Sequence, residues 1–301
     1  MKKFINSIKK QFSKVKFYDR TLWKSYASFI AFVSTILTII SFFFSKDDMI
    51  VPSIVLFLVF LVILFLGFIK YWYDANKLKD VDLKINNTNV EVIEGDIFDS
   101  LNKPEKHKDE VTVIAANSGF DTVVDDKTVA KKTLHGQYIN RIEKQNKLED
   151  LILKIENDEF LNRFKIKQSV KDKIIDPKVK YELGSMVEFE NYIITAFVDY
   201  DKENKAFLSA DEYMHFWMKF WENIDTIYAG RTINIPLIGA GITRFRDGKP
   251  SKQQLLEMML WTLKISGFHN TYANRKIKFI IYKDDIPEID FYHIKHNVNF
   301  K

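Results

Sequence analysis

Two long runs without a charged residue constrain this chain more than any other feature. Residues 25–44 form a run of twenty and residues 49–69 a run of twenty-one, and each matches the length that a helix needs to cross a hydrocarbon core of ~30 Å. Only the segment SKDD separates them. Because a signal peptide or one buried core helix does not account for two such runs in tandem, the sequence predicts a transmembrane helical hairpin over residues 25–69.

Positive charge gathers outside the predicted hairpin. Residues 1–24 contain eight lysines or arginines and one acid, Asp19, while the loop between the two runs is net acidic. The positive-inside rule therefore places both chain ends in the cytoplasm. Trp23, Tyr26 and the aromatic residues 71–73 lie at the outer ends of the runs, as an interfacial aromatic belt on the cytoplasmic leaflet requires.

The basic leader, residues 1–24, has an apolar stripe. Phe4, Ile8, Phe12 and Val15 recur at helical spacing among the lysines. This pattern indicates an amphipathic helix lying on an anionic leaflet, and a disordered basic arm is the alternative.

The first apolar run carries small and weakly polar residues on one helical face, whereas the second is almost wholly aliphatic. The residues on this face are Ala27, Ala31, Ser34, Thr38 and Ser41. Small residues let helices approach closely, so the face predicts packing within the hairpin, a contact between subunits or a pore-lining face.

Charge and cysteine content exclude several classes of protein. The formal net charge is +5, but the excess lies in the leader, so residues 70–301 are close to neutral and a broad nucleic-acid footprint is not expected. The chain has no cysteine, which excludes disulfides, thiol nucleophiles and cysteine-ligated zinc. His293 and His296 have helical spacing but no evident third ligand. We expect neither a metal nor a cofactor.

A soluble domain is predicted at residues 89–301, after a polar linker at residues 70–88. Short β-branched runs predict strands at residues 90–93, 111–117, 186–190, 192–198, 232–238 and 277–282. Helical patterns occupy about residues 97–103, 126–175 in pieces, 209–227 and 251–266. This alternation is typical of an α/β sheet with helices on its faces.

Two glycine-containing segments follow predicted strands, where ligands bind in such sheets. Residues 94–99 read EGDIFD, and residues 239–245 read GAGITRF. A glycine turn can bring main-chain N–H groups around a phosphate because no Cβ blocks the approach. Taken alone, Asp96 also fits a helix cap, and the glycine turn an ordinary strand exit.

Together with AANSGFD at residues 115–121, these segments resemble the macro domain, an ADP-ribose-binding α/β/α module, over about residues 81–301. The longer segment 115–139, with the hairpin before it, resembles more specifically the transmembrane-macro effectors of bacterial Thoeris antiphage defence. The resemblance implies an N-terminal two-helix transmembrane hairpin followed by an α/β/α macro domain with a mixed central sheet. It places the chain in the bacterial inner (cell) membrane.

The same resemblance implies a function. In that family a TIR-domain partner converts NAD into an ADP-ribose-type signal, of the histidine-ADP-ribose kind. The macro domain binds the signal, and the membrane segments then disrupt the bilayer and cause abortive infection. We also expect a homo-oligomer, and no nucleic-acid partner.

The resemblance assigns roles to single residues. Asp96 would accept a hydrogen bond from the adenine amino group, the Ile97 backbone would read the ring, and Asn117 would contact the distal ribose. The backbone of residues 239–244 would wrap the pyrophosphate, with Phe245 on a ribose or ring face. The expected ligand-binding set is Asp96, Ile97, Asn117, Asp121, Gly239, Ala240, Gly241, Ile242, Thr243, Arg244 and Phe245.

Arg244 lies outside the general macro-domain pattern. A guanidinium beside a phosphate loop can bind a diphosphate or a carboxylate through two hydrogen bonds. A solvent-facing side chain is the alternative.

Hydrolytic macro domains usually have glycines soon after the asparagine, where this chain has Val123 and Val124. We therefore expect a receptor and not an enzyme, although Asp121, Asp125, Asp126 and His135 are candidates for acid-base chemistry. The alternatives are a membrane-tethered ADP-ribosylhydrolase and a passive anchor for an ADP-ribose-binding module.

A lysine- and glutamate-rich helical insertion is expected at about residues 136–180. It forms either a solvated face or a subunit contact.

Overall fold

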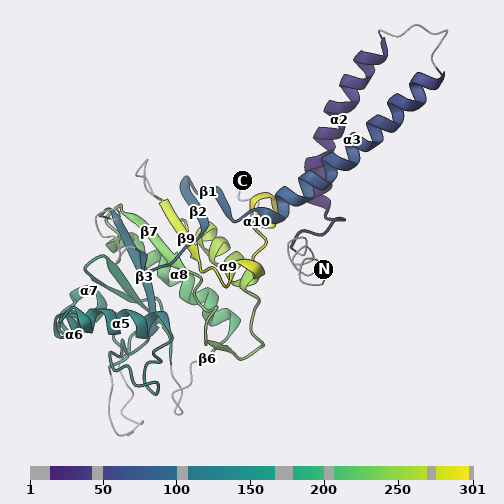
Figure 1. Cartoon of the computed structure of the whole chain (residues 1–301). Helices are drawn as coiled ribbons and strands as arrows, with labels where there is room; N and C mark the ends of the chain where they lie inside the picture. The colour runs from purple at the N-terminus through teal and green to yellow at the C-terminus, as the bar shows by residue number, and fades with distance from the viewer. Residues whose placement is uncertain are drawn as a thin grey trace. The chain divides into compact units, whose positions relative to one another are not determined.

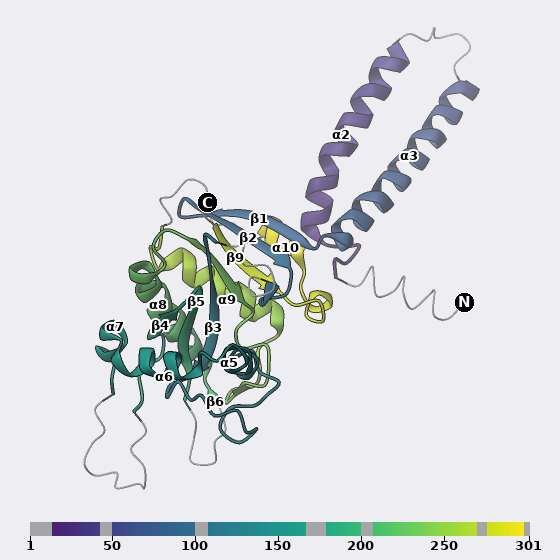
Figure 2. The same cartoon turned by 60° about the vertical axis from the view of Figure 1, so that its left-hand side comes forward.

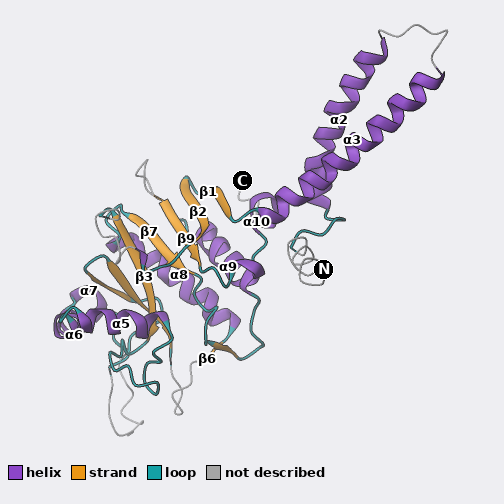
Figure 3. Ribbon diagram, viewed as in Figure 1, coloured by secondary structure: helices purple, strands orange, loops and turns teal. Residues whose placement is uncertain are grey.

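The computed structural model describes residues 14–42, 50–99, 108–166, 179–199, 207–269 and 276–297. The chain divides into two compact units (Figures 1 and 3). The helical unit comprises Met1–Val81 with Ile289–Asn299, and the sheet unit comprises Asp82–Glu288 with Phe300–Lys301. The predicted domain boundaries differ from this division, because the C-terminal segment groups with the hairpin and not with the sheet.

The helical unit contains two helices that are long and apolar enough to cross a membrane, α2 (Arg20–Phe42) and α3 (Ile50–Lys77). Helix α2 begins at Arg20 because the Asp19 carboxylate accepts hydrogen bonds from the N–H groups of Thr21 (2.8 Å) and Leu22 (3.0 Å). Helix α3 continues to Lys77, so much of the linker expected at residues 70–88 is regular structure.

Aromatic side chains, and not the small-residue face, join the two helices of the hairpin. A Cβ at Gly67 would lie 2.5 Å from the Phe29 ring, so the absence of a side chain at Gly67 lets this ring pack closely against α3. The Tyr26 hydroxyl donates to the Leu64 carbonyl, and Trp23 stacks on Phe68 with ring centroids 4.7 Å apart. The small-residue face of α2 is at most partly covered: Ala27, Ala31, Thr38 and Ser41 are exposed, and Ser34 is half-buried.

The base of the hairpin is closed by the chain segments on either side of it. The buried Asn76 side chain accepts from the N–H of Val15 (2.9 Å) and donates to its carbonyl (3.2 Å). Helix α10 (Phe291–Asn297) returns to α2, where the Tyr292 hydroxyl donates to Ser25 Oγ at 2.9 Å. Residues 1–13 lie outside the described residues, so the amphipathic leader stays a prediction.

The sheet unit is built on a seven-stranded mixed sheet in the order β1-β2-β9-β7-β3-β5-β4. Its strands are β1 (Asp80–Ile85), β2 (Thr88–Glu94), β3 (Glu110–Asn117), β4 (Met186–Phe189), β5 (Tyr192–Val198), β7 (Thr232–Pro236) and β9 (Lys276–Ile281). Strands β2, β9, β7, β3 and β5 run parallel, and β4 is antiparallel to β5. A small second sheet pairs β6 (Phe207–Leu208) with β8 (Arg244–Phe245).

Helices cover both faces of the large sheet (Figure 2). Helices α5 (Leu134–Lys144), α6 (Leu148–Asn157) and α7 (Glu159–Asn162) pack on the face that presents Ile114 and Ile194. Helices α8 (Ala210–Ile227) and α9 (Lys252–Ile265) lie on the opposite face, where the Phe197 and Phe216 rings meet edge to face with centroids 4.9 Å apart. Capping boxes at Ser209 and Ser251 fix the starts of α8 and α9.

The predicted fold class is confirmed, and the differences have local causes. Residues 126–133, expected to be helical, form a loop, since Asp125 Oδ1 accepts from the N–H of Thr128 (2.6 Å) and Asp126 Oδ1 from that of Lys131 (2.8 Å). Such side-chain bonds compete with the helix ladder. The helix expected at residues 97–103 falls mostly outside the described residues, and β1 and α10 were not predicted.

Candidate functional site

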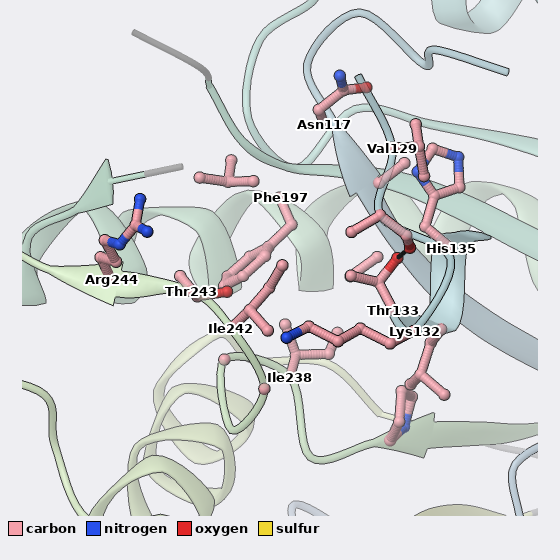
Figure 4. Close-up of a pocket in the computed structure, with 18 of the residues that line it drawn as sticks. Asn117, Val129, Lys132, Thr133, His135, Phe197, Ile238, Ile242, Thr243 and Arg244 are labelled. Carbon is pink, nitrogen blue, oxygen red and sulfur yellow. Dashed lines mark hydrogen bonds between the residues drawn. The ribbon is translucent and has the colours of Figure 1, made fainter. Parts of the chain in front are cut away.

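A cavity of about 670 Å³ opens where β3, β5 and β7 end. One wall is formed by residues 126–130 and 132–135, at the start of α5, and the other by residues 236–239 and 241–244, at the end of β7 and after it. Asn117 and Phe197 lie between the two walls (Figure 4). This is the edge at which ligands bind in parallel α/β sheets, and the volume suits a small organic ligand.

The wall after β7 is the glycine turn. Gly239 has φ +89°, a backbone conformation that residues with a side chain rarely adopt, and a Cβ there would lie 3.2 Å from the Tyr213 ring. The Tyr213 hydroxyl donates to the Ile238 carbonyl at 2.9 Å. Lys249 Nζ donates to the carbonyls of Ala240 (2.9 Å) and Gly241 (2.6 Å). The turn is therefore fastened from α8 and from the loop before α9.

Main-chain N–H groups are left available on this wall. Within the described part of the chain, the N–H groups of Gly241, Ile242 and Thr243 donate to no acceptor, although all three residues line the cavity. Consecutive free N–H groups form a concave site for an anion. The turn is suited to a phosphate.

The opposite wall offers N–H groups of the same kind at the start of α5. Thr133 caps this helix, its Oγ1 accepting from the N–H of Gly136 at 3.0 Å. The N–H groups of Leu134 and His135 have no acceptor among the described residues, and both residues line the cavity. The first turn of a helix carries partial positive charge, so this wall also attracts an anion.

Two exposed cations add to the attraction of the cavity for an anion. Lys132 reaches into the cavity from the α5 wall, and Arg244 lies on the opposite wall (Figure 4). The Arg244 guanidinium lies 5.7 Å from the centre of the Phe207 ring. This cation–π contact stabilises the arginine side chain in its position. The neighbouring cation Lys131 instead pairs with Asp126 at 3.7 Å.

Asn117 is buried beneath the cavity and tied to Asp121. Its Nδ2 donates to Asp121 Oδ2 at 2.6 Å, while the Asp121 N–H donates to its Oδ1 at 3.0 Å. An amide has two N–H donors, so Asn117 keeps one for a ligand. Asp121 itself does not line the cavity; it orients the asparagine.

His135 is a titratable group enclosed at the cavity wall. Its side chain is 5% exposed. Burial lowers the pKa of the imidazole from 6.5 to about 4, against the opposing effect of the Asp121 carboxylate. His135 is therefore neutral at physiological pH, and it can exchange hydrogen bonds with a ligand without adding charge.

The structure brings together six of the eleven predicted ligand-binding residues. Those that line the cavity are Asn117, Gly239, Gly241, Ile242, Thr243 and Arg244. Asp121 and Ala240 support these residues through the contacts above. Ile97 is buried in the core next to Phe98. Phe245, expected on a ribose or ring face, instead packs its ring on Tyr213 at 5.8 Å.

Asp96 does not line the cavity. Its Oδ1 accepts from the N–H of Phe98 at 2.9 Å, a local turn of the capping kind.

Glycine at position 136 is needed to close the α5 wall. A Cβ there would lie 2.3 Å from the Ala130 carbonyl oxygen. We expect Gly136→Ala to lower the free energy of unfolding by about 2 kcal/mol and the melting temperature by roughly 4–8 °C. Scanning calorimetry of the full chain in detergent checks this.

Gly119→Ala is the matched control, because a Cβ at Gly119 would have its nearest neighbour at 3.6 Å. An equal loss of stability in both variants would show that the close approach at Gly136 is not the cause.

Comparison with known proteins identifies the family. The macro domain of the Thoeris protein ThsA matches residues 90–282. The Thoeris protein ThsA of Bacillus amyloliquefaciens (strain Y2) is 33% identical over 276 residues, which cover 88% of this chain and 87% of that protein. This chain belongs to the Thoeris ThsA family. The resemblance read from the sequence is confirmed, and with it a role as an effector of antiphage defence. The macro domain of this ThsA-family chain also suggests ADP-ribose-type ligands for the cavity.

Several cavity residues were not predicted as ligand-binding. Phe197 follows from the strand order, which places the end of β5 beside that of β3. Lys132 and Thr133 come directly before the start of α5. Because a helix was expected from residue 126, this helix start was not recognised in the sequence. His135 was considered only for acid-base chemistry.

Proposed function

We propose that this chain is a membrane-bound receptor whose macro domain binds an ADP-ribose-derived signal. The observation that carries the proposal is the convergence of free N–H groups from two walls, at Gly241–Thr243 and at Leu134–His135, on one cavity. Lys132 and Arg244 add two positive charges there. A diphosphate is the chemical group that this arrangement favours.

The remainder of the ligand is of the ADP-ribose type. Phosphate at the centre of the cavity leaves Asn117 and His135 at one side as uncharged hydrogen-bonding groups, and Phe197 and Ile238 as apolar surface. Sugar hydroxyls can form hydrogen bonds with Asn117 and His135, and the face of a ring can pack on Phe197 and Ile238. Arg244 is available for a charged terminal group, such as the carboxylate of a histidine-ADP-ribose-like signal.

Binding without hydrolysis fits the contacts of the acid-base candidates. Asp121 is held by Asn117, and His135 is neutral and buried. Asp125 caps the turn at Thr128. None of these groups is presented as a base beside a nucleophile. The enzyme alternative is a membrane-tethered ADP-ribosylhydrolase.

The membrane part of the proposal rests on α2 and α3. Both helices are long and apolar enough to cross a bilayer, and the basic ends of the hairpin favour two spans with both termini in the cytoplasm. The exposed small residues of α2, such as Ala31 and Thr38, favour a homo-oligomer. In the proposed cycle, a TIR-domain protein makes the signal from NAD, and its binding leads to membrane disruption and abortive infection.

Calorimetry of the full chain in detergent tests the ligand class. We expect binding of ADP-ribose and of its histidine conjugate, with AMP and ribose 5-phosphate at least tenfold weaker, because each lacks the diphosphate. Equal affinity for AMP would contradict a diphosphate site. Chromatography of the ligand after incubation tests the enzyme alternative: ADP-ribose release from an ADP-ribosylated peptide, lost in Asn117→Ala, would show a hydrolase.

A further inference from the structure

A second cavity, of about 400 Å³, lies in the helical unit. Three elements build it: Ser25 comes from α2, Lys70 and Tyr71 from α3, and Tyr292 and Lys295 from α10. It is separate from the macro-domain cavity, and nothing in the proposed binding of an ADP-ribose-type signal uses it.

The cavity lies at the end of the apolar part of α3. Large apolar side chains along α3, among them Phe65 and Leu66, are exposed up to Ile69, and Lys70 is the first charged residue. Trp23 and Phe68, stacked on each other, belong to the same level of the hairpin. Amphipathic aromatic residues occupy the headgroup level of a bilayer. In the proposed transmembrane arrangement, the cavity therefore opens among the lipid headgroups of the cytoplasmic leaflet.

The groups that line this cavity suit a phosphate. Lys70 and Lys295 contribute two ammonium groups, and His296 an imidazole whose ring lies 4.4 Å from that of Tyr292. Asp74 is the acid of the lining, and it pairs with Lys70 at 3.0 Å. The net charge of the lining is positive. Basic pockets between helices at this depth are where anionic lipid headgroups bind.

The position of Lys295 is built into the fold. Phe291 and Ile294 are buried and fix α10, and the Tyr292 hydroxyl donates to Ser25 Oγ at 2.9 Å. Lys295 on α10 and Lys70 on α3, which are 225 positions apart in the sequence, thereby line one cavity. A lysine that only extends its charge from a helix end into water needs no second lysine beside it. Here the fold brings together two lysines from distant parts of the chain.

We propose that this cavity binds the phosphate of an anionic phospholipid headgroup, with Lys70 and Lys295 as its main contacts. The acyl chains then lie along the exposed apolar surface of α3. This proposal rests on the transmembrane arrangement proposed above. A soluble phosphate has the same charge but lacks the acyl chains, so the two sources can be separated.

The test uses the full chain in nanodiscs of phosphatidylcholine and phosphatidylglycerol. Native mass spectrometry measures how much phosphatidylglycerol stays bound after release from the disc. We expect Lys70→Gln with Lys295→Gln to reduce its retention about tenfold, since each basic residue near an anionic headgroup contributes on the order of a fivefold effect and Asp74 offsets part of one. Excess inorganic phosphate should leave retention by the unsubstituted chain unchanged.

The matched control is Lys24→Gln with Lys77→Gln, because these lysines flank the same hairpin but do not line the cavity. An equal loss in both pairs, or no loss in either, would overturn the site. Displacement by inorganic phosphate would overturn the assignment to lipid. A chain that does not enter nanodiscs would contradict the membrane arrangement itself, whereas a chain that enters and retains no phosphatidylglycerol contradicts only the lipid site.

Discussion

Binding of ADP-ribose is expected to fall by a factor on the order of 10³ when Lys132→Glu and Arg244→Glu are combined. A hydrogen bond to a charged group contributes about 1.5–3 kcal/mol, and each substitution replaces an attraction for the diphosphate by a repulsion. Both side chains are exposed at the cavity, so the fold should not change. Calorimetry with ADP-ribose measures the effect, and circular dichroism checks the fold.

The chain offers a control of equal charge close by. Lys131 and Arg246 lie one and two positions away and pair instead with Asp126 (3.7 Å) and Glu212 (3.5 Å), and neither lines the cavity. Lys131→Glu with Arg246→Glu should change the affinity by less than about fivefold, the size of a screened surface effect. If the two double substitutions weakened binding equally, the general charge of the domain would explain the loss of affinity, and the diphosphate would not lie between Lys132 and Arg244.

Acid is expected to destabilise the sheet unit through His135. Its pKa is about 4 in the folded chain against 6.5 for the free side chain, so the unfolded chain binds the proton more tightly. The stability that neutral His135 contributes is therefore fully present above pH 6.5 and is lost as the pH falls from 6.5 toward 4. By about pH 5 the loss is about 2 kcal/mol.

Denaturant unfolding at about pH 7.5 and at about pH 5 measures this loss. His135→Gln keeps a polar side chain without a titration in this range and should show an acid-induced loss smaller by about 2 kcal/mol. His215→Gln, at an exposed position on α8, should keep the full loss. If His135→Gln were as acid-sensitive as the unsubstituted chain, another group would cause the effect.

The sequence alone predicted the helices and strands whose patterns lie within one short segment. The two charge-free runs predicted the hairpin helices, and the β-branched runs located six strands of the large sheet. Ser209 and Ser251 stand where predicted helices begin, and both cap them. Strand β1 was missed because its alternating polar residues look like a linker when no partner strand is known.

The cavity was only half predictable, because the course of its α5 wall depends on side-chain hydrogen bonds that the hydrophobic pattern of the sequence does not reveal. The glycine turn has its own signature, but the loop before α5 takes its course from Asp125 and Asp126 acting as turn acceptors in a segment that otherwise looks helical. The neutral state of His135 depends on burial under neighbouring segments. The return of α10 to α2 leaves no mark in the sequence, since Tyr292 meets Ser25 across almost the entire chain.

Signal binding can drive the membrane part only if the signal binds the active arrangement better than the resting one. A passive anchor would bind the same ligand and leave the bilayer intact. The difference between receptor and anchor therefore lies in the response of the membrane and not in affinity.

The most direct measurement is dye release from liposomes that contain the full chain. On addition of the histidine conjugate of ADP-ribose, release is expected from liposomes with the unsubstituted chain and with Lys131→Glu/Arg246→Glu. No release is expected with Lys132→Glu/Arg244→Glu, or from liposomes without protein. Intact liposomes in the presence of ligand that calorimetry shows to be bound would contradict a receptor that acts on the bilayer.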